Sequence, residues 1–126
     1  MTSAQREIQA MDNPIAMQIT GLTPDIGLVV LTGRLDIAGA HTIDLQFSAV
    51  SGAYRNLIID MVGVSFLASI GIRTLLLGAK TVQRRGGKFL IVAPRPDVAE
   101  VLTVTGVDEL MPIVPSLADA RAAIGG

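Results

Sequence analysis

The hydroxyl of Ser69 is the side chain in this sequence best placed to do chemistry, because it stands where a helix is predicted to begin. In one interpretation Ser69 is the helix N-cap, and its hydroxyl accepts a hydrogen bond from a backbone N–H of the first turn, which contributes about 1 kcal/mol. In the other, the free N–H groups and the helix dipole at this end would favour a phosphate on that hydroxyl. The residue types favour the cap.

A hydrolase site around Ser69 does not fit the sequence. A nucleophile elbow requires Gly two residues on either side of the Ser, and the earlier of these positions is Leu67. The single imidazole, His41, is predicted to lie on a different helix, three residues from Asp44. The chain has no Cys, which excludes Cys-based zinc sites and thiol nucleophiles. We therefore expect no enzymatic activity, no cofactor and no metal site.

Positive charge gathers in the middle of the chain. Residues 61–96 contain six basic side chains and no acidic one, namely Arg73, Lys80, Arg84, Arg85, Lys88 and Arg95. Cations are favoured at a helix C-terminus, and this explains Arg84 and Arg85. No phosphate-binding glycine loop and no nucleic-acid-binding motif is present, and three Phe, one Tyr and no Trp provide few aromatic rings that could stack on bases. We expect no nucleic-acid partner.

The elements that position Ser69 follow from the spacing of apolar residues. Strands are predicted over 15–20 and 26–31, and the short turn between them predicts an antiparallel hairpin. Helices and strands then alternate, with helices over 36–50, 69–85, 97–105 and 116–123 and strands over 57–62, 88–93 and 110–114. This order predicts an α/β fold: a mostly parallel sheet of about five strands, an antiparallel N-terminal hairpin edge and four helices.

The domain is expected to span residues 14–126 and to follow a flexible N-terminal tail over 1–13. Residues 61–79 are apolar, but Arg73 lies inside this stretch and would cost about 2.5–3.5 kcal/mol near a membrane centre. We therefore expect no transmembrane helix. Because the N-terminus also lacks the apolar core of a signal peptide, a cytoplasmic location is expected.

Function in an open parallel sheet gathers where strands end, which here points to residues 32–39 and 63–70. Ile70, at a helix start, is the best candidate for an exposed apolar contact, and Phe66 and Leu67 are predicted to lie in the core. Arg34, Asp36 and Arg73 could form a polar rim, although Asp36 could equally be the N-cap of the first helix.

Four segments together resemble one known family. They are Gly33-Arg34-Leu35-Asp36, Leu57-Ile58-Ile59-Asp60, the run Val64-x-Phe66-Leu67-Ala68-Ser69-Ile70-Gly71-Ile72, and the Gly86-Gly87-Lys88 entry to a strand. This pattern resembles the STAS domain family, which comprises sulfate-transporter and anti-sigma-factor-antagonist domains. The match spans about residues 14–124, and its most specific part is 57–78. The family's fold agrees with the order of elements predicted above.

The resemblance implies a protein-interaction module in bacterial transcription regulation or signalling. Stand-alone members bind a partner-switching kinase of the anti-sigma type through the loop before the second helix and the first turns of that helix. The partner phosphorylates a Ser or Thr immediately before the Gly of that loop. Phosphorylation adds a charge of about −1.5 to −2, and the resulting repulsion and desolvation break the complex. The positions that match this loop are Ala68, Ser69, Ile70 and Gly71, and together with the polar rim of Arg34, Asp36 and Arg73 they are the predicted partner-binding residues.

This sequence departs from the family pattern at the phosphoacceptor. The usual run is Asp-Ser-Ser/Thr-Gly, and here it is Ala68-Ser69-Ile70-Gly71, so the acceptor position holds Ile70, which has no hydroxyl. Either Ser69 or Thr74 substitutes for it, or the domain binds without this control. We favour loss of the switch, because a hydroxyl engaged in a helix cap would be poorly presented to a kinase.

Other functions and partners stay open at this point. The missing phosphoacceptor also fits a STAS subunit of a membrane transport or lipid-trafficking complex, which would ride on a transporter ATPase. The basic segment 61–96 offers some support for a nucleotide-sensing module. A hairpin edge could also pair with another copy of the chain, so a homodimer is possible.

Overall fold

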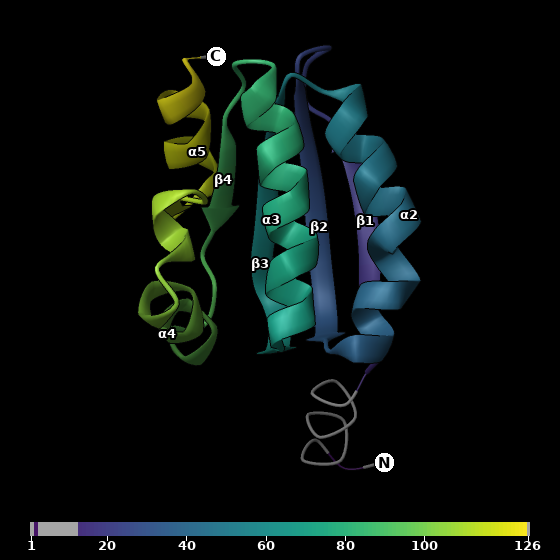
Figure 1. Cartoon of the computed structure of the whole chain (residues 1–126). Coiled ribbons are helices and arrows are strands. Elements are labelled where there is room, and N and C mark those ends of the chain that lie inside the picture. Colours follow the sequence, from purple (N-terminus) through teal and green to yellow (C-terminus); the bar gives the residue numbers. More distant parts are fainter. Residues whose placement is uncertain (1, 3–12, 126) are drawn as a thin grey trace.

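The fold is a five-stranded sheet with helices on both faces, seen in a computed structural model that describes residue 2 and residues 13–125 (Figure 1). Strands β1 (Ala16–Gly21) and β2 (Ile26–Leu35) form the antiparallel hairpin. Strands β3 (Asn56–Leu67), β4 (Phe89–Val92) and β5 (Ile113–Val114) continue the sheet in parallel, in the order β1-β2-β3-β4-β5. The predicted fold class is confirmed. The predicted flexible tail lies outside the described residues, apart from residue 2 and Asn13.

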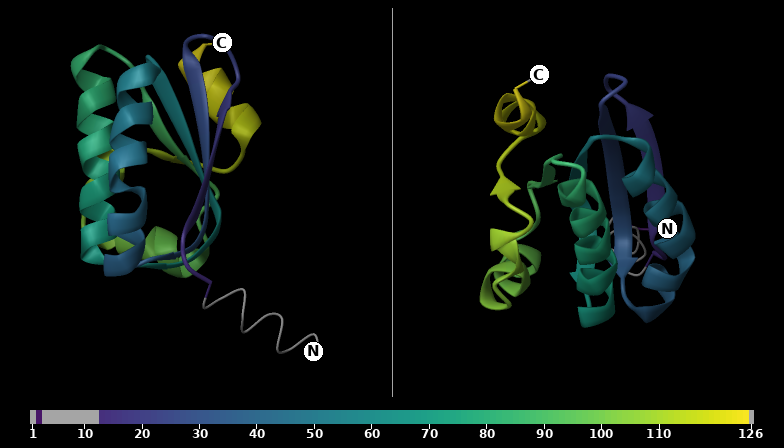
Figure 2. Two further views of the ribbon diagram at one scale, coloured as in Figure 1. Left: turned by 90° about the vertical axis from the view of Figure 1, so that its right-hand side faces the viewer. Right: turned by 45° about the horizontal axis from the view of Figure 1, so that its top comes forward.

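The helices are distributed unequally between the two faces of the sheet. Helices α2 (Ile37–Ala53), α3 (Ser69–Arg84) and α4 (Pro96–Val104) bury side chains in the larger core cluster, whereas α5 (Leu117–Ile124) lies on the opposite face. Figure 2 shows α2 and α3 side by side on one side of the sheet and α5 on the other. In the described part of the chain, no helix combines the length and the apolar character needed to cross a bilayer.

Burial on both faces explains the continuous apolar run of β3. Leu57 and Ile59 point into the larger core, while Ile58 packs in the smaller cluster together with Leu90 and Ala120. A central strand covered on both faces reads as an unbroken apolar segment rather than an alternating one. This strand carries the chain to the start of α3.

Two predicted strand ends are wrong, because both strands continue beyond the last residue predicted for them. Strand β2 continues past Thr32 and Gly33 to Leu35, and β3 continues past Val62 to Leu67. Gly33 adopts a φ of 98°, and the pairing of β2 with β3 shifts register on either side of Thr32-Gly33. A glycine inside a strand often marks such an irregularity and does not end the strand.

The two predicted functional loops are therefore tight turns. Asp36 alone connects β2 to α2, and Ala68 alone connects β3 to α3. Near the C-terminus, 107–109 form a short 3₁₀ helix (η1, Val107–Glu109), and only Ile113–Val114 pair as a strand. Helix α4 begins at Pro96, one residue before the predicted start at Asp97.

Candidate functional site

The two turns lie side by side at one end of the sheet, because the strands before them end in register. Leu35 at the end of β2 pairs with Leu67 at the end of β3. The backbone N–H of Ala68 donates a hydrogen bond to the Leu35 carbonyl at 3.0 Å, which ties one turn to the other. The site residues predicted from sequence on these turns, Arg34, Asp36 and Ala68 to Gly71, are thereby brought together.

Two glycines let both helices begin close to the end of β2. A Cβ atom on Gly71 would lie 2.7 Å from the Leu35 carbonyl oxygen and 2.7 Å from the Leu35 Cγ. A Cβ atom on Gly39 would lie 2.4 Å from the Arg34 carbonyl oxygen. These distances are shorter than any ordinary carbon contact, so a larger residue would push the helix away from the strand. Gly71, predicted as a site residue, is thus required by packing.

Asp36 is both the N-cap of α2 and the partner of Arg34. Its Oδ1 accepts a hydrogen bond from the backbone N–H of Gly39 at 2.8 Å, and the Arg34 Nε donates to its Oδ2 at 3.4 Å. The hydrogen bond from Gly39 lowers the pKa of the Asp36 carboxyl, partial desolvation opposes this change, and the neighbouring Arg34 lowers the pKa further. The cap predicted for Asp36 is confirmed.

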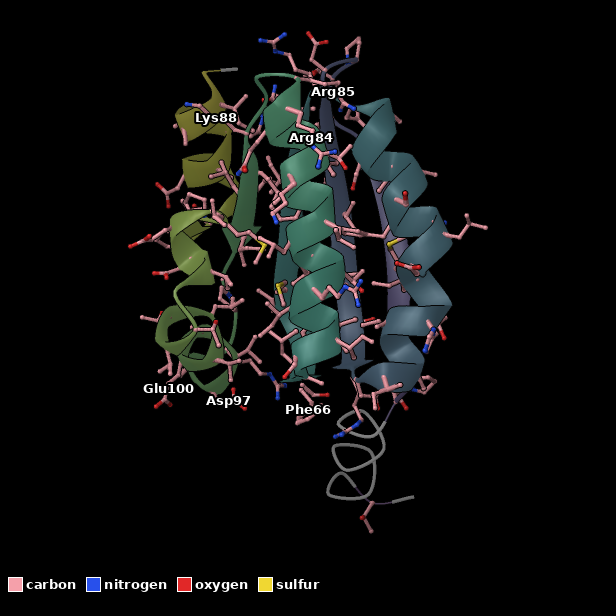
Figure 3. The ribbon with its side chains drawn as sticks, in the orientation of Figure 1. Phe66, Arg84, Arg85, Lys88, Asp97 and Glu100 are labelled. Carbon is pink, nitrogen blue, oxygen red and sulfur yellow. The ribbon has the colours of Figure 1, made fainter. Side chains whose placement is uncertain are left out.

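Phe66 is exposed, contrary to the prediction that it lies in the core. Its side chain is 41% exposed, whereas Leu67, with 6% exposed, is buried as expected. Neighbouring residues of a strand point to opposite faces, and Leu67 packs in the larger core, so Phe66 points away from that core at the end of β3, where Figure 3 labels it. The Arg34 guanidinium carbon lies 4.3 Å from the centroid of the Phe66 ring, which is a cation–π distance.

The contact between Arg34 and Phe66 was not anticipated from the sequence. The two residues are register partners in adjacent strands, and their pairing depends on the irregularity at Gly33. A sequence signal existed in principle, since Arg34 stands two positions and Phe66 three positions before a predicted helix start. Without the register, nothing indicated that they face each other.

The N-cap predicted for Ser69 is wrong. Ala68, which has extended backbone angles, is the N-cap of α3 and makes no side-chain cap hydrogen bond. Ser69 is the first residue of the helix, and its side chain is exposed. The pairing of Leu35 with Leu67 and the bond from Ala68 to Leu35 fix the extended conformation at Ala68, one residue before the Ser. The hydroxyl is therefore presented to solvent at the helix start.

The remaining predicted site residues lie along the first two turns of α3. Ile70 is half-buried, Arg73 is exposed, and Thr74 is only 7% exposed. The Thr74 hydroxyl donates to the Ile70 carbonyl at 3.2 Å, so it is both covered and hydrogen-bonded. Among the residues that the structure describes, no group of three or more His, Cys, Asp or Glu side chains could hold a metal ion.

The fold and the site define the class of this protein as an α/β domain with a mixed five-stranded sheet. At one end of the sheet lie two tight turns, the exposed ring of Phe66 against Arg34, and the start of α3 with the exposed hydroxyl of Ser69. Residues 17–120 match the STAS domain family, and the chain belongs to this family.

Known relatives cover most of this chain. A candidate anti-sigma factor antagonist of Bordetella bronchiseptica, BtrV, is 27% identical over 97 residues, which make up 76% of this chain and 84% of BtrV. The crystal structure of an anti-sigma factor antagonist from Mycobacterium paratuberculosis superposes with a TM-score of 0.80 at 26% identity, covering 89% of this chain and 95% of that one. A STAS domain protein from Planctomyces limnophilus gives a TM-score of 0.77 at 25% identity, covering 87% and 98%.

Proposed function

We propose that this protein acts as an anti-sigma-factor antagonist, binding a partner-switching kinase of the anti-sigma type without catalysing a reaction. The observation that carries the proposal is the surface formed by the two turns in a chain that belongs to the STAS family. The similar chains named above as anti-sigma factor antagonists support this function over a transport subunit or a nucleotide sensor.

The chemistry of the two turns suits a protein partner. Phe66 and Ile70 supply apolar area, and Arg34, Asp36 and Arg73 surround it with charge. Exposed apolar groups with a polar rim are typical of interaction sites, and Phe and Arg are enriched at such interfaces. The cation–π contact with Phe66 and the hydrogen bond to Asp36 hold the Arg34 side chain in place before a partner binds. This reduces the conformational entropy lost on binding.

Phosphorylation control would differ from that of the family. Ile70 cannot accept a phosphoryl group, and the buried, hydrogen-bonded hydroxyl of Thr74 is inaccessible to a kinase. The exposed hydroxyl of Ser69 is the group on this surface that a kinase could reach. Its exposure removes the helix cap as an argument against modification, but this hydroxyl stands one residue before the family's acceptor position and not at it. We propose on that ground that the antagonist binds without a phosphorylation switch. Intact-mass measurement after incubation with the kinase and ATP should show an unmodified chain, and a phosphoryl group on Ser69 would contradict this.

Binding to an anti-sigma kinase encoded in the same genome tests the proposal, with isothermal titration calorimetry as the readout. The unmodified chain should bind, and Ile70→Asp should abolish binding, because it places a charge in the apolar centre of the surface. Val104→Asp is the matched control, since Val104 is an exposed apolar residue near the end of α4. Equal affinity of the two variants would remove the surface from the proposal.

A further inference from the structure

A groove runs between α2 and α3, starting at Ile70 and following both helices away from the turns. It contains two adjoining hollows with volumes of about 230 and 310 Å³, which share Asp44, Thr74 and Leu77. Small residues form part of its floor, with Ala40 on α2 and Gly78 on α3. The groove is open along its length and is continuous with the proposed partner surface, because Ile70 belongs to both.

Leu45 of α2 and Leu77 of α3 lie on opposite sides of this groove, at corresponding positions of the two helices. Leu45 is 86% exposed and Leu77 is 52% exposed, and both line the second hollow. Each is the ninth residue of its helix, and α2 and α3 begin at the same end of the sheet. An exposed leucine is unremarkable alone, but two that face one hollow from neighbouring helices form a seat for an apolar side chain.

A basic stripe on α3 borders the groove, and its first residue, Arg73, lines the first hollow. Arg73, Lys80 and Arg84 are exposed, and α3 contains no acidic residue. The spacing from Arg73 to Leu77, Lys80 and Arg84 is four, three and four residues, which places all four on one helical stripe. In the described part of the chain, Arg73, Lys80 and Arg84 form no ion pair, so their charge is available to a partner.

We infer that the groove between α2 and α3 binds an acidic amphipathic helix of the partner. One apolar side chain of that helix lies between Leu45 and Leu77, and its two acidic residues face Arg73 and Lys80. Because a helix rises 1.5 Å per residue, those two cations are separated by roughly 10 Å along α3. The complementary pattern is two acids seven residues apart with an apolar residue between them. The inference rests on the proposed function, since the kinase would present this helix beside the turns.

The groove favours a helix over a polyanion such as DNA or an anionic membrane. Its α2 wall contains no Lys or Arg; His41 lines the first hollow, and the exposed Asp44 lines both. A phosphate-rich surface would meet positive charge on one wall only and would have nothing to place between the two leucines. A helix with two acids seven residues apart and an apolar residue midway presents all three along one stripe, which matches the order Arg73, Leu77, Lys80 on α3.

The probe for the test is a synthetic helical peptide with two Glu residues seven apart, a Leu midway between them and an Ala/Gln background. Its binding to the full chain is followed by ¹H–¹⁵N correlation spectra and by fluorescence anisotropy. We expect the amide signals of Asp44, Thr74 and Leu77 to shift and those of α5 to stay in place. A peptide with Lys at both Glu positions should not bind.

Charge reversal gives the decisive comparison. The double variant Arg73→Glu/Lys80→Glu should weaken peptide binding about tenfold, since each reversal replaces an attraction with a repulsion of similar size. Arg55→Glu/Arg95→Glu carries the same net charge, changes two exposed cations away from the groove, and should bind like the unmodified chain. Equal weakening in both double variants would overturn the inference.

Two further outcomes would also overturn it. One is binding of duplex DNA or phosphatidylserine vesicles that depends on Arg73 and Lys80 while the peptide stays unbound, which would assign the stripe to a polyanion. The other is a chain that binds the kinase but gives no shifts in the groove with the peptide. That result would leave the proposed function intact and remove only the groove, because the peptide test needs no kinase.

Discussion

Replacing Gly71 with Ala tests how the turn before α3 is held against β2. A Cβ atom at this position would lie 2.7 Å from both the carbonyl oxygen and the Cγ of Leu35, and 3.1 Å from the Leu67 Cδ1. The carbonyl is backbone and is fixed by the hydrogen bond from Ala68, so it cannot move aside cheaply. Either α3 shifts away from the strand or the strand end distorts.

The size of the effect follows from comparison with Gly52. This residue also lies inside a helix, α2, but a Cβ atom there would meet nothing within 4 Å. Gly52→Ala should stabilise the protein by about 0.5–1 kcal/mol, since Ala is the better helix former. Gly71→Ala gains the same propensity but also introduces overpacking, which costs about 1–3 kcal/mol. The two variants should therefore differ in free energy of unfolding by about 1–3 kcal/mol.

Urea denaturation followed by circular dichroism measures this difference. We expect a higher denaturation midpoint for Gly52→Ala than for the unmodified chain and a lower one for Gly71→Ala, with equal slopes for all three proteins. If Gly71→Ala proved as stable as Gly52→Ala, the close approach of α3 to Leu35 would be incorrect, and with it the geometry derived for the turn.

Two other predictions concern stability. The pKa of Asp36 is lowered in the folded state, so its charge stabilises the fold above the ordinary pKa of 3.8, and this contribution is lost as the pH falls below that value. Asp36→Asn retains a capping side chain and removes only the charge. Its unfolding midpoint should therefore be lower than that of the unmodified chain at pH 7 and should converge with it below pH 3.8. A difference in midpoint that stays constant with pH would refute the role of the charge. Leu75→Ala should lower the free energy of unfolding by about 2–5 kcal/mol, because Leu75 is fully buried. Leu45→Ala should change it by less than about 0.5 kcal/mol, because Leu45 is exposed. Thermal unfolding of the two variants compares them directly.

The layered fold was predictable because apolar spacing alternates between strand and helix along most of the chain. The errors fall where tertiary pairing overrides a local signal. A glycine at the end of an apolar run usually indicates the end of a strand. Gly33 instead lets β2 pass Pro14 and keep pairing with β3, since a Cβ atom at Gly33 would lie 2.5 Å from the Pro14 carbonyl oxygen. Local sequence contains no information about that approach.

The candidate site was predictable in its residues but not in its contacts. The spacing of Asp36 before a helix correctly indicated a cap, because capping is a local interaction. Ser69 carries the same signal and does not cap, because the pairing of Leu35 with Leu67 sets where α3 begins. Phe66 was predicted to be buried because apolar residues at strand ends usually point inward, and only the sheet register places its ring against Arg34.

The central claim is that the turns before α2 and α3 dock a kinase of the anti-sigma type. A titration of the ¹⁵N-labelled chain with that purified kinase, followed by ¹H–¹⁵N correlation spectra, tests it most directly. We predict that the signals of Arg34, Ser69, Ile70 and Gly71 shift or broaden first, while those of α5 on the opposite face persist. Spectra in which α5 responds and these four residues do not would contradict the claim.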